Sequence, residues 1–312
     1  MQLTFLRSVS GIEVQKTDCF SERSEIMLDT EQTVITEDFR FPSGSATLSA
    51  RLYQPLNPPE TVVVLNSATG VPRDYYRHFA RWLAAEQGMA CLTYDYRDYG
   101  QSLSGRMKDA RTTMADWALI DMPAARTEMR RRFPDAQHWT IGHSVGAMLG
   151  PVQPDVNQID RMICVCSGLV TLTDHPWPYR GLAGLFWYGH APLLVKALGY
   201  LPGKAIGFGA DLPASVYWQW RKWCTAPLNY VPEIGTDLPA TRWTGSGKPV
   251  DLFTFEDDQM VPPQAVWRLA DLYGTEAKRH LLRPTDLGLS EVGHIGAFAR
   301  RNAALWPRLI DA

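Results

Sequence analysis

The chain of 312 residues has no apolar stretch of the roughly 18–20 residues that a membrane-spanning helix needs. Its start, MQLTFLRSVSGIEVQKTDCF, also lacks the cationic segment and long apolar run of a secretory signal peptide. Neither sign of charge is in excess, because 31 Lys and Arg stand against 33 Asp and Glu and give a formal net charge of -2. The composition therefore gives no indication of a membrane span, and none of binding to nucleic acid or to an anionic membrane.

Cysteine is scarce as well, since the five residues are odd in number and show no spacing typical of a metal site. Cys91, Cys164 and Cys166 fall in expected buried strands, where a free thiol behaves as a small apolar side chain. A phosphate-binding loop is also missing, because Gly247 and Lys248 are followed by proline and lack the earlier glycine. We therefore expect a reduced, cytoplasmic protein without a metal or a cofactor.

What the chain does contain is a regular alternation of strand and helix patterns. Short apolar runs, such as TVVVL at 61–65, are typical of strands that are buried on both faces. Strands are expected at 33–41, 46–54, 61–65, 89–94, 138–141, 162–166, 250–255 and 279–282. Helices are expected at 74–86, 113–133, 263–273 and 295–309, with Pro123 kinking or splitting the second of them. Such alternation predicts an α/β fold, with a mostly parallel sheet covered by helices on both faces.

The alternation stops between residues 168 and 247, where glycine and proline separate short apolar pieces. We therefore expect an N-terminal extension at 1–30, a core domain made of 31–167 and 248–312, and a helical cap inserted at 168–247. The cap holds six of the eleven tryptophans but only four acidic residues. Three of these tryptophans are candidates for lining an apolar substrate pocket, with packing in the core as the alternative: Trp187, Trp218 and Trp220.

One motif carries a candidate nucleophile: residues 142–146, GHSVG, are the chain's one match to the pattern G-x-S-x-G. An apolar strand is expected before the motif and a helix of small residues after it. Strand, turn and helix in this order are the context of a nucleophile elbow, whose sharp turn exposes the serine hydroxyl. Ser144 is therefore a candidate nucleophile, with a serine of a purely structural turn as the alternative.

A serine hydroxyl becomes a nucleophile only when a base takes its proton and a carboxylate orients that base. Of the seven histidines, His294 lies in a loop before the last expected helix, from which an imidazole can reach the elbow. Capping of that helix is the alternative role. Glu256, Asp257 and Asp258 directly follow an apolar strand. By position alone any one of them can be the acid, the others being solvated loop charges.

These features together resemble the α/β-hydrolase superfamily over about residues 33–312. The resemblance rests on GHSVG at 142–146, DYRDYGQS at 95–102, Asp258 with Val261-Pro262 and Gly293-His294. Further segments resemble a subgroup of predicted serine hydrolases of the serine aminopeptidase or esterase type, which have a helical cap: ATGVP at 68–72, LP at 212–213 and WQWRKWC at 218–224. The superfamily's fold has a mostly parallel sheet of the eight-stranded type with helices on both faces.

The resemblance also assigns roles to residues. It selects Asp258 over Asp257 as the acid, because the family's acid is followed by two residues and then Val-Pro. It implies that the backbone N–H groups of Val145 and Ala68 form an oxyanion hole. The chain departs from the family at Asn66-Ser67, where many members have His-Gly, and at Asp98, where many have glycine.

The function that this resemblance implies is hydrolysis of a carboxylic ester by a triad of Ser144, His294 and Asp258 through an acyl-enzyme. An acyltransferase or a thioesterase with the same triad is the first alternative, and a non-catalytic binding protein on this fold is the second. Because the cap is poor in acids, which a free amine would need as partners, the expected substrate is a small neutral or apolar ester. No cofactor is implied.

Overall fold

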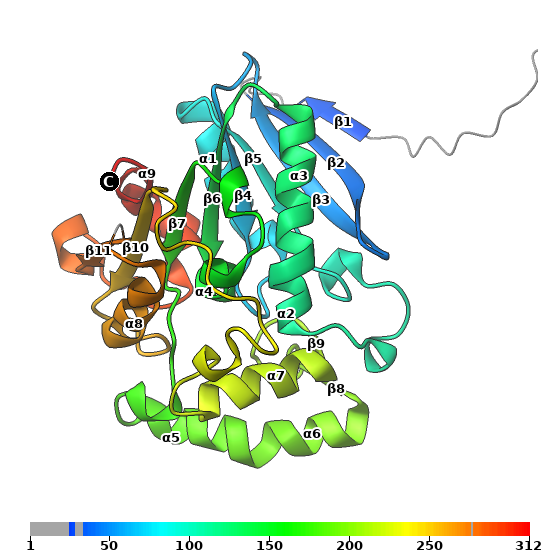
Figure 1. Cartoon of the computed structure of the whole chain (residues 1–312), viewed down its shortest axis with the longest axis vertical. Coiled ribbons are helices and arrows are strands. Elements are labelled where there is room, and N and C mark those ends of the chain that lie inside the picture. Colours follow the sequence, from blue (N-terminus) through cyan, green and yellow to red (C-terminus); the bar gives the residue numbers. More distant parts are fainter. Residues whose placement is uncertain (1–24, 29–33, 276) are drawn as a thin grey trace, which may run out of the picture.

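A computed structural model describes residues 25–28, 34–275 and 277–312, in which one large sheet forms the centre of the molecule (Figure 1). Nine strands of the described chain pair in the order β1-β2-β3-β5-β4-β6-β7-β10-β11. The strands from β5 to β11 run parallel, whereas β1, β2 and β3 are antiparallel to their neighbours. The strands are β1 (Glu25–Leu28), β2 (Val34–Ser43), β3 (Ala46–Pro55), β4 (Thr61–Asn66), β5 (Ala90–Tyr94), β6 (Gln137–His143), β7 (Arg161–Val165), β10 (Val250–Phe255) and β11 (Ala277–Leu282).

The predicted α/β architecture is confirmed, and each strand expected from the sequence is present. The strand β1 is an addition to the eight expected ones. It lies within the region assigned to an N-terminal extension, yet it pairs antiparallel with β2. The first residue of the strand expected at 33–41 lies outside the described residues, as does Cys19.

Neighbouring side chains of the central strands face two separate cores. In β4, Val62 and Val64 pack into one core, while Val63 and Leu65 pack into the other. The helices α3 (Met122–Arg132) and α8 (Pro263–Tyr273) cover the first core, and α1 (Arg77–Glu86) and α9 (Trp306–Ile310) cover the second. Burial on both faces explains why these parallel strands are apolar runs.

One helix changes its hydrogen-bond pattern beside the proline expected to kink or split it, and another differs from its sequence-based expectation. The helix expected at 113–133 is α2 (Met114–Asp116) followed by a π-helical turn at Trp117–Asp121 and then by α3. Pro123 has no N–H to donate within the helix, so the hydrogen-bond pattern changes at this point.

The prediction of a single helix at 295–309 is wrong. Two 3-10 turns, Gly296–Phe298 and Arg300–Leu305, precede the short α9. Ala299 between them is extended, with φ -70° and ψ 138°. The Asn302 side chain donates to the Gly296 carbonyl at 3.0 Å. This side-chain bond takes an acceptor that a regular helix would use for its own backbone.

The residues between β7 and β10 place three helices at one end of the molecule, beside the elbow at the carboxyl end of β6 (Figure 1). We call residues 168–247 the cap segment. Its main elements are α5 (Tyr179–Gly184), a π-helical stretch (Leu185–His190), α6 (Ala191–Leu198), the hairpin β8 (Tyr200–Leu201) and β9 (Leu212–Pro213), and α7 (Ala214–Thr225). Within the described ranges, no helix combines the length and the apolarity needed to cross a bilayer.

Candidate active site

Ser144 stands at the sharp turn between β6 and α4 (Val145–Met148). Its φ of 55° and ψ of -117° lie in a region that residues with a side chain rarely adopt. Two hydrogen bonds hold this backbone: the Ser144 N–H donates to the Val165 carbonyl at 2.9 Å, and Ser167 Oγ donates to the Ser144 carbonyl at 2.7 Å. The turn is thus fixed from β7, the neighbouring strand.

The two glycines of the motif are required by close packing around this turn. A Cβ on Gly142 would lie 2.5 Å from the Ala147 Cβ, and one on Gly146 would overlap the Asn66 carbonyl. Asn66 in turn donates from Nδ2 to the Gly146 carbonyl at 3.0 Å, and its Oδ1 accepts from Tyr94 Oη at 2.7 Å. The asparagine that departs from the family's histidine therefore ties the end of β4 to the elbow.

The structure brings Ser144, His294 and Asp258 together, although 150 positions separate the first two. His294 Nε2 lies 3.0 Å from Ser144 Oγ, and His294 Nδ1 lies 2.9 Å from Asp258 Oδ2. His294 is 8% exposed and Asp258 2% exposed. The second Asp258 oxygen accepts from the N–H groups of Met260 and Val261 at 2.9 and 2.8 Å. A buried carboxylate with these donors remains an acceptor, so the Nδ1–H of His294 points at it and Nε2 faces the serine.

Asp257 has a different role, which could not be predicted from the sequence. One of its carboxylate oxygens accepts from the N–H groups of Val292 and Gly293, at 2.8 and 3.0 Å. These residues directly precede His294. Asp257 therefore holds the loop that presents the imidazole, instead of being a solvated loop charge.

A buried chain of hydrogen bonds joins His294 to the loop after β4. The Ala68 N–H donates to Tyr76 Oη at 2.9 Å, and Tyr76 Oη lies 2.8 Å from His143 Nδ1. His143 Nε2 lies 2.9 Å from the His294 carbonyl. Since that carbonyl can only accept, His143 carries its proton on Nε2, and the tyrosine donates to Nδ1. Burial, with His294 nearby, lowers the pKa of His143 to about 3, so its ring is neutral.

These contacts correct one expectation about the oxyanion hole. The Ala68 N–H is engaged by Tyr76 and is not free to bind an oxyanion in this arrangement. The N–H groups of Val145 and Thr69 have no hydrogen-bond acceptor among the residues that the structure describes. The Val145 N–H is therefore available for the role that the resemblance implies, and Thr69 offers the next N–H along the loop.

The hydroxyl of Tyr76 allows a prediction about stability. In Tyr76→Phe, the Ala68 N–H and His143 Nδ1 lose their partner in a fully buried place. We expect the free energy of unfolding to fall by about 1–3 kcal/mol. The matched control is Tyr99→Phe, because Tyr99 Oη is buried without a partner in the described chain. This control should be neutral or slightly stabilising. Urea unfolding of both variants measures the difference, and equal losses would contradict the assigned bonds.

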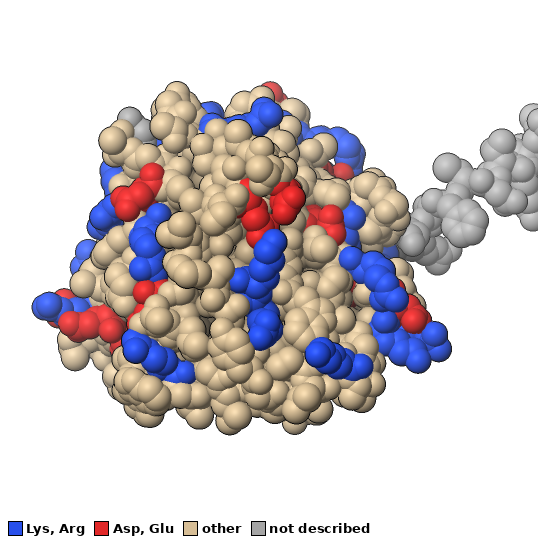
Figure 2. All heavy atoms as spheres, turned by 60° about the horizontal axis from the view of Figure 1, so that its bottom comes forward, with Lys and Arg blue, Asp and Glu red and all other residues tan. Residues whose placement is uncertain are grey.

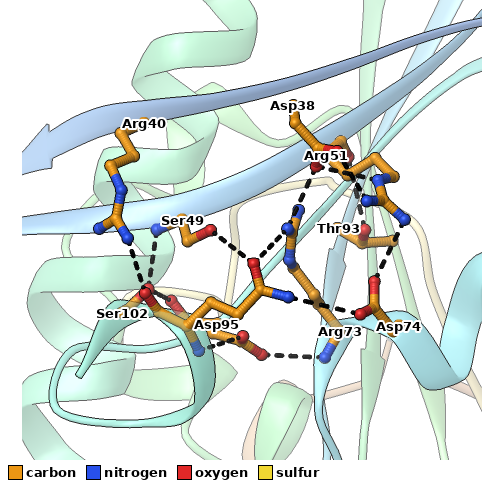
Figure 3. Close-up of polar contacts among 10 residues, drawn as sticks. Asp38, Arg40, Ser49, Arg51, Arg73, Asp74, Thr93, Asp95 and Ser102 are labelled. Atoms are coloured by element: carbon orange, nitrogen blue, oxygen red, sulfur yellow. Dashed lines mark hydrogen bonds and ion pairs between the residues drawn. The ribbon is translucent and has the colours of Figure 1, made fainter. Parts of the chain in front are cut away.

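The segment at 95–102, part of the resemblance, contacts the loop after β4, because Tyr96 Oη donates to the Ser67 carbonyl at 2.8 Å. Figure 3 shows Asp95 of the same segment beside Arg73. Asp95 is buried, which raises its pKa, and its carboxylate accepts from the N–H groups of Arg73 and Gln101 at 2.9 and 2.8 Å. Gly100 has φ 53°, and a Cβ there would lie 2.5 Å from the Asp95 carboxyl carbon.

Asp98, the second departure from the family, also has a positive φ, of 56°. The family's glycine suits this backbone, whereas an aspartate tolerates it at some cost.

One group of described side chains comes close enough to hold a metal ion. The ligand atoms of Cys166, Asp258 and His294 lie within 4.8 Å of one another. Two of the three are already bonded to each other, and burial raises the pKa of the Cys166 thiol well above its usual range. A protonated thiol beside a carboxylate is a donor to it and a poor metal ligand.

A cavity of about 440 Å³ lies between Ser144 and the cap segment. Its walls are mainly apolar and aromatic, and no Asp, Glu, Lys or Arg of the described chain lines it. Two of the three expected tryptophans, Trp187 and Trp220, belong to the lining. Trp218 does not line the cavity. It precedes Trp220 by two positions on α7, so its side chain lies on another side of the helix, where it packs edge-on against Tyr217.

Comparisons with known proteins place this site in context. No protein-family model and no curated protein matches the chain. Among solved structures, it is similar to an esterase from Pyrococcus furiosus, with 16% identity over 88% of this chain and 89% of that one and a TM-score of 0.58. The enol-lactonase from Burkholderia xenovorans is 14% identical over 88% and 98% of the two chains, with a TM-score of 0.56. An alpha-beta serine hydrolase homologue from Coxiella burnetii is 14% identical over 88% and 96%, with a TM-score of 0.52. At such identities the likeness shows a common fold.

Proposed function

We propose that this chain, which has the α/β-hydrolase fold of the structures it resembles, is a serine hydrolase that cleaves a carboxylic ester. The observation that carries the proposal is the hydrogen-bonded series from Ser144 Oγ through His294 to the buried Asp258, with distances of 3.0 and 2.9 Å. A serine hydroxyl, an imidazole and a carboxylate in this order are the machinery of acyl transfer, on whatever fold they occur.

In the proposed reaction, Ser144 Oγ attacks the ester carbonyl while His294 Nε2 takes the hydroxyl proton. Asp258 stabilises the resulting imidazolium through Nδ1–H. The tetrahedral intermediate expels the alcohol, which leaves with the proton from His294. Water then attacks the acyl-enzyme with His294 again acting as base, and the carboxylic acid is released. One ester and one water thus give one acid and one alcohol.

The negative oxygen of the tetrahedral intermediate needs donors that already point at it. We assign the first to the Val145 N–H, which directly follows the nucleophile. In place of Ala68, whose N–H is bonded to Tyr76, we assign the second to the Thr69 N–H. Both are backbone groups, so the Asn66-Ser67 departure does not affect their chemistry.

The cavity supports a neutral, apolar acyl group as the part of the substrate that binds beside Ser144. Its aromatic wall includes Trp187, Phe208 and Trp220. The ring centroid of Trp220 lies 4.7 Å from that of Trp187 and 5.3 Å from that of Phe208. No Asp, Glu, Lys or Arg of the described chain lines the cavity to pair with an ionic acyl group, and moving such a group out of water without a partner would be costly.

Labelling with a fluorophosphonate, followed by peptide mapping, tests the proposal. Attachment to Ser144 is expected, whereas no labelling, or labelling of another serine, would overturn it. A series of p-nitrophenyl esters and matching thioesters, with added alcohols as competing acceptors, then separates an esterase from a thioesterase or an acyltransferase.

The acyl pocket gives a second prediction. Replacing Trp220 with alanine enlarges the cavity, so the ratio of kcat/KM for p-nitrophenyl decanoate over acetate should rise about tenfold or more. Trp218→Ala is the matched control, because this residue lies on the same helix outside the cavity, and its ratio should remain unchanged. Rates and melting temperatures are measured together. Equal ratios in both variants, with a lower melting temperature for Trp220→Ala, would make Trp220 a core residue only.

A further inference from the structure

The outer side of the cap segment carries most of the large exposed apolar side chains of the described molecule. Six of them lie within 177–198, and we call them the cap face: Trp177, Leu182, Leu185, Tyr188, Leu193 and Leu198. Trp177 is 73% exposed and Leu193 is 69% exposed. Large apolar side chains exposed together along one arm of the cap are typical of interaction sites, whereas ordinary solvated surface carries them singly.

These side chains are not needed for the core, because the same arm packs inward with other residues. Trp187, Ala191 and Val195 are spaced four apart, as on one side of a helix, and all three are buried. A helix that packs on one side normally turns polar residues to water on the other. Here the outer side is apolar as well, which indicates a second surface to be covered.

The stretch of chain that carries the cap face contains basic residues and no acidic one, with Asp174 and Asp211 at its two ends. Residues 175–210 contain three basic residues, Arg180, Lys196 and Lys204, and no acidic residue, although the whole chain has a net charge of -2. Figure 2 turns this end of the molecule toward the viewer: uncharged side chains make up most of its lower part, with Lys and Arg among them, and Asp and Glu are visible farther up. A surface of this kind complements a layer of anionic headgroups above an apolar phase.

The cap face is continuous with the cavity beside Ser144. Leu182 and Leu185 are exposed on the cap face, at 63% and 58%, and they also line the cavity. The way from the outer surface to the nucleophile is therefore bordered by apolar side chains. An acyl chain leaving a lipid layer at this point would stay in apolar surroundings until its ester reached the serine.

We infer that the cap face docks on an anionic lipid surface and that the apolar ester enters the cavity from there. The docking stands on the exposed side chains and their charge alone, whereas the delivery of substrate rests on the proposed function. A second copy of the chain fits less well, because a two-fold contact through this face would bring like charges together: Arg180, Lys196 and Lys204 of each copy.

The test is sedimentation of the full chain with vesicles of pure phosphatidylglycerol or pure phosphatidylcholine. Binding to phosphatidylglycerol is expected, together with weaker binding to phosphatidylcholine. The double variant Trp177→Ser/Leu193→Ser should bind phosphatidylglycerol about tenfold more weakly, since it removes two apolar groups that the layer would bury. The matched control is Leu56→Ser/Leu281→Ser, whose leucines are exposed away from the cap and whose binding should be unchanged.

Two further measurements separate the possible results. Hydrolysis of p-nitrophenyl butyrate without vesicles tests the proposed function alone, and it should be equal in both double variants, because none of the four residues lines the cavity. The charge reversal Lys196→Glu/Lys204→Glu should weaken binding to phosphatidylglycerol more than to phosphatidylcholine. The inference is overturned if the native chain binds neither kind of vesicle, or if the two double serine variants bind phosphatidylglycerol equally well. It is also overturned if light scattering shows a dimer that Trp177→Ser/Leu193→Ser converts to a monomer.

Discussion

Ser144→Ala should lower kcat for p-nitrophenyl butyrate by about a millionfold, because the members of a triad act as a unit and the nucleophile has no substitute. Binding of the ester should persist, since the cavity wall is unchanged. The strained backbone at φ 55° is held by bonds from Val165 and Ser167 that alanine does not disturb. The melting temperature should therefore stay close to that of the native chain.

Steady-state kinetics and fluorophosphonate labelling of the purified variant check this result. Residual turnover within tenfold of the native rate would assign the nucleophile elsewhere. A lost activity combined with an unfolded protein would be uninformative, so the variant's circular dichroism and melting curve are recorded in the same buffer.

Asp258→Asn is expected to lower kcat by about 10⁴-fold through the tautomer of His294. The single amide oxygen of the asparagine would accept from the N–H groups of Met260 and Val261, which now bond Asp258 Oδ1. Its NH₂ group would then face His294 Nδ1, and Nδ1 would have to accept. The imidazole proton moves to Nε2, where the ring cannot take a proton from Ser144.

The control for this variant is the neighbouring acid. Asp257→Asn keeps an oxygen for the N–H groups of Val292 and Gly293, so the loop that presents His294 is retained and kcat should fall only a few-fold. Both rates are measured over pH 5 to 9. A larger loss in Asp257→Asn than in Asp258→Asn would exchange the two roles.

The sequence predicts the parts of this molecule that follow from local patterns. The apolar runs of β4, β5 and β7 arise because parallel strands are buried on both faces, and the glycines of GHSVG are needed by the turn itself. Positions 263–273 form a helix as expected, since an apolar stripe begins there after prolines that suit a helix start.

What the sequence could not predict depends on contacts between distant residues. The bond from His143 to the His294 carbonyl joins positions 151 apart, and the Asp257 bonds reach 35 and 36 positions along the chain. No spacing rule signals such pairs. The engagement of Ala68 by Tyr76 belongs to the same class, because a family motif places a backbone group without saying what else bonds to it.

The net charge of the whole chain carries no information on local charge, because a near-zero value averages over the surface. The basic, acid-free run at 175–210 is balanced by acids elsewhere, and only its gathering in the cap gives it meaning. Trp218 shows the same limit at smaller scale, since a tryptophan-rich stretch of sequence does not tell which of its side chains face the cavity.

The cap segment connects two neighbouring strands of the sheet and can therefore vary independently of the rest of the fold. The chain leaves the sheet at the end of β7 and returns at β10, and these two strands are hydrogen-bonded neighbours with Met162 opposite Val250. An insertion between adjacent strands can be lengthened, shortened or exchanged without shifting the register of any other pair. Ser144, Asp258 and His294 all lie outside it. Replacing residues 168–247 with a different segment is therefore a route to new substrate selectivity that leaves the catalytic residues in place. Evolutionary variation in this segment would change which substrates are accepted before it changed the reaction mechanism.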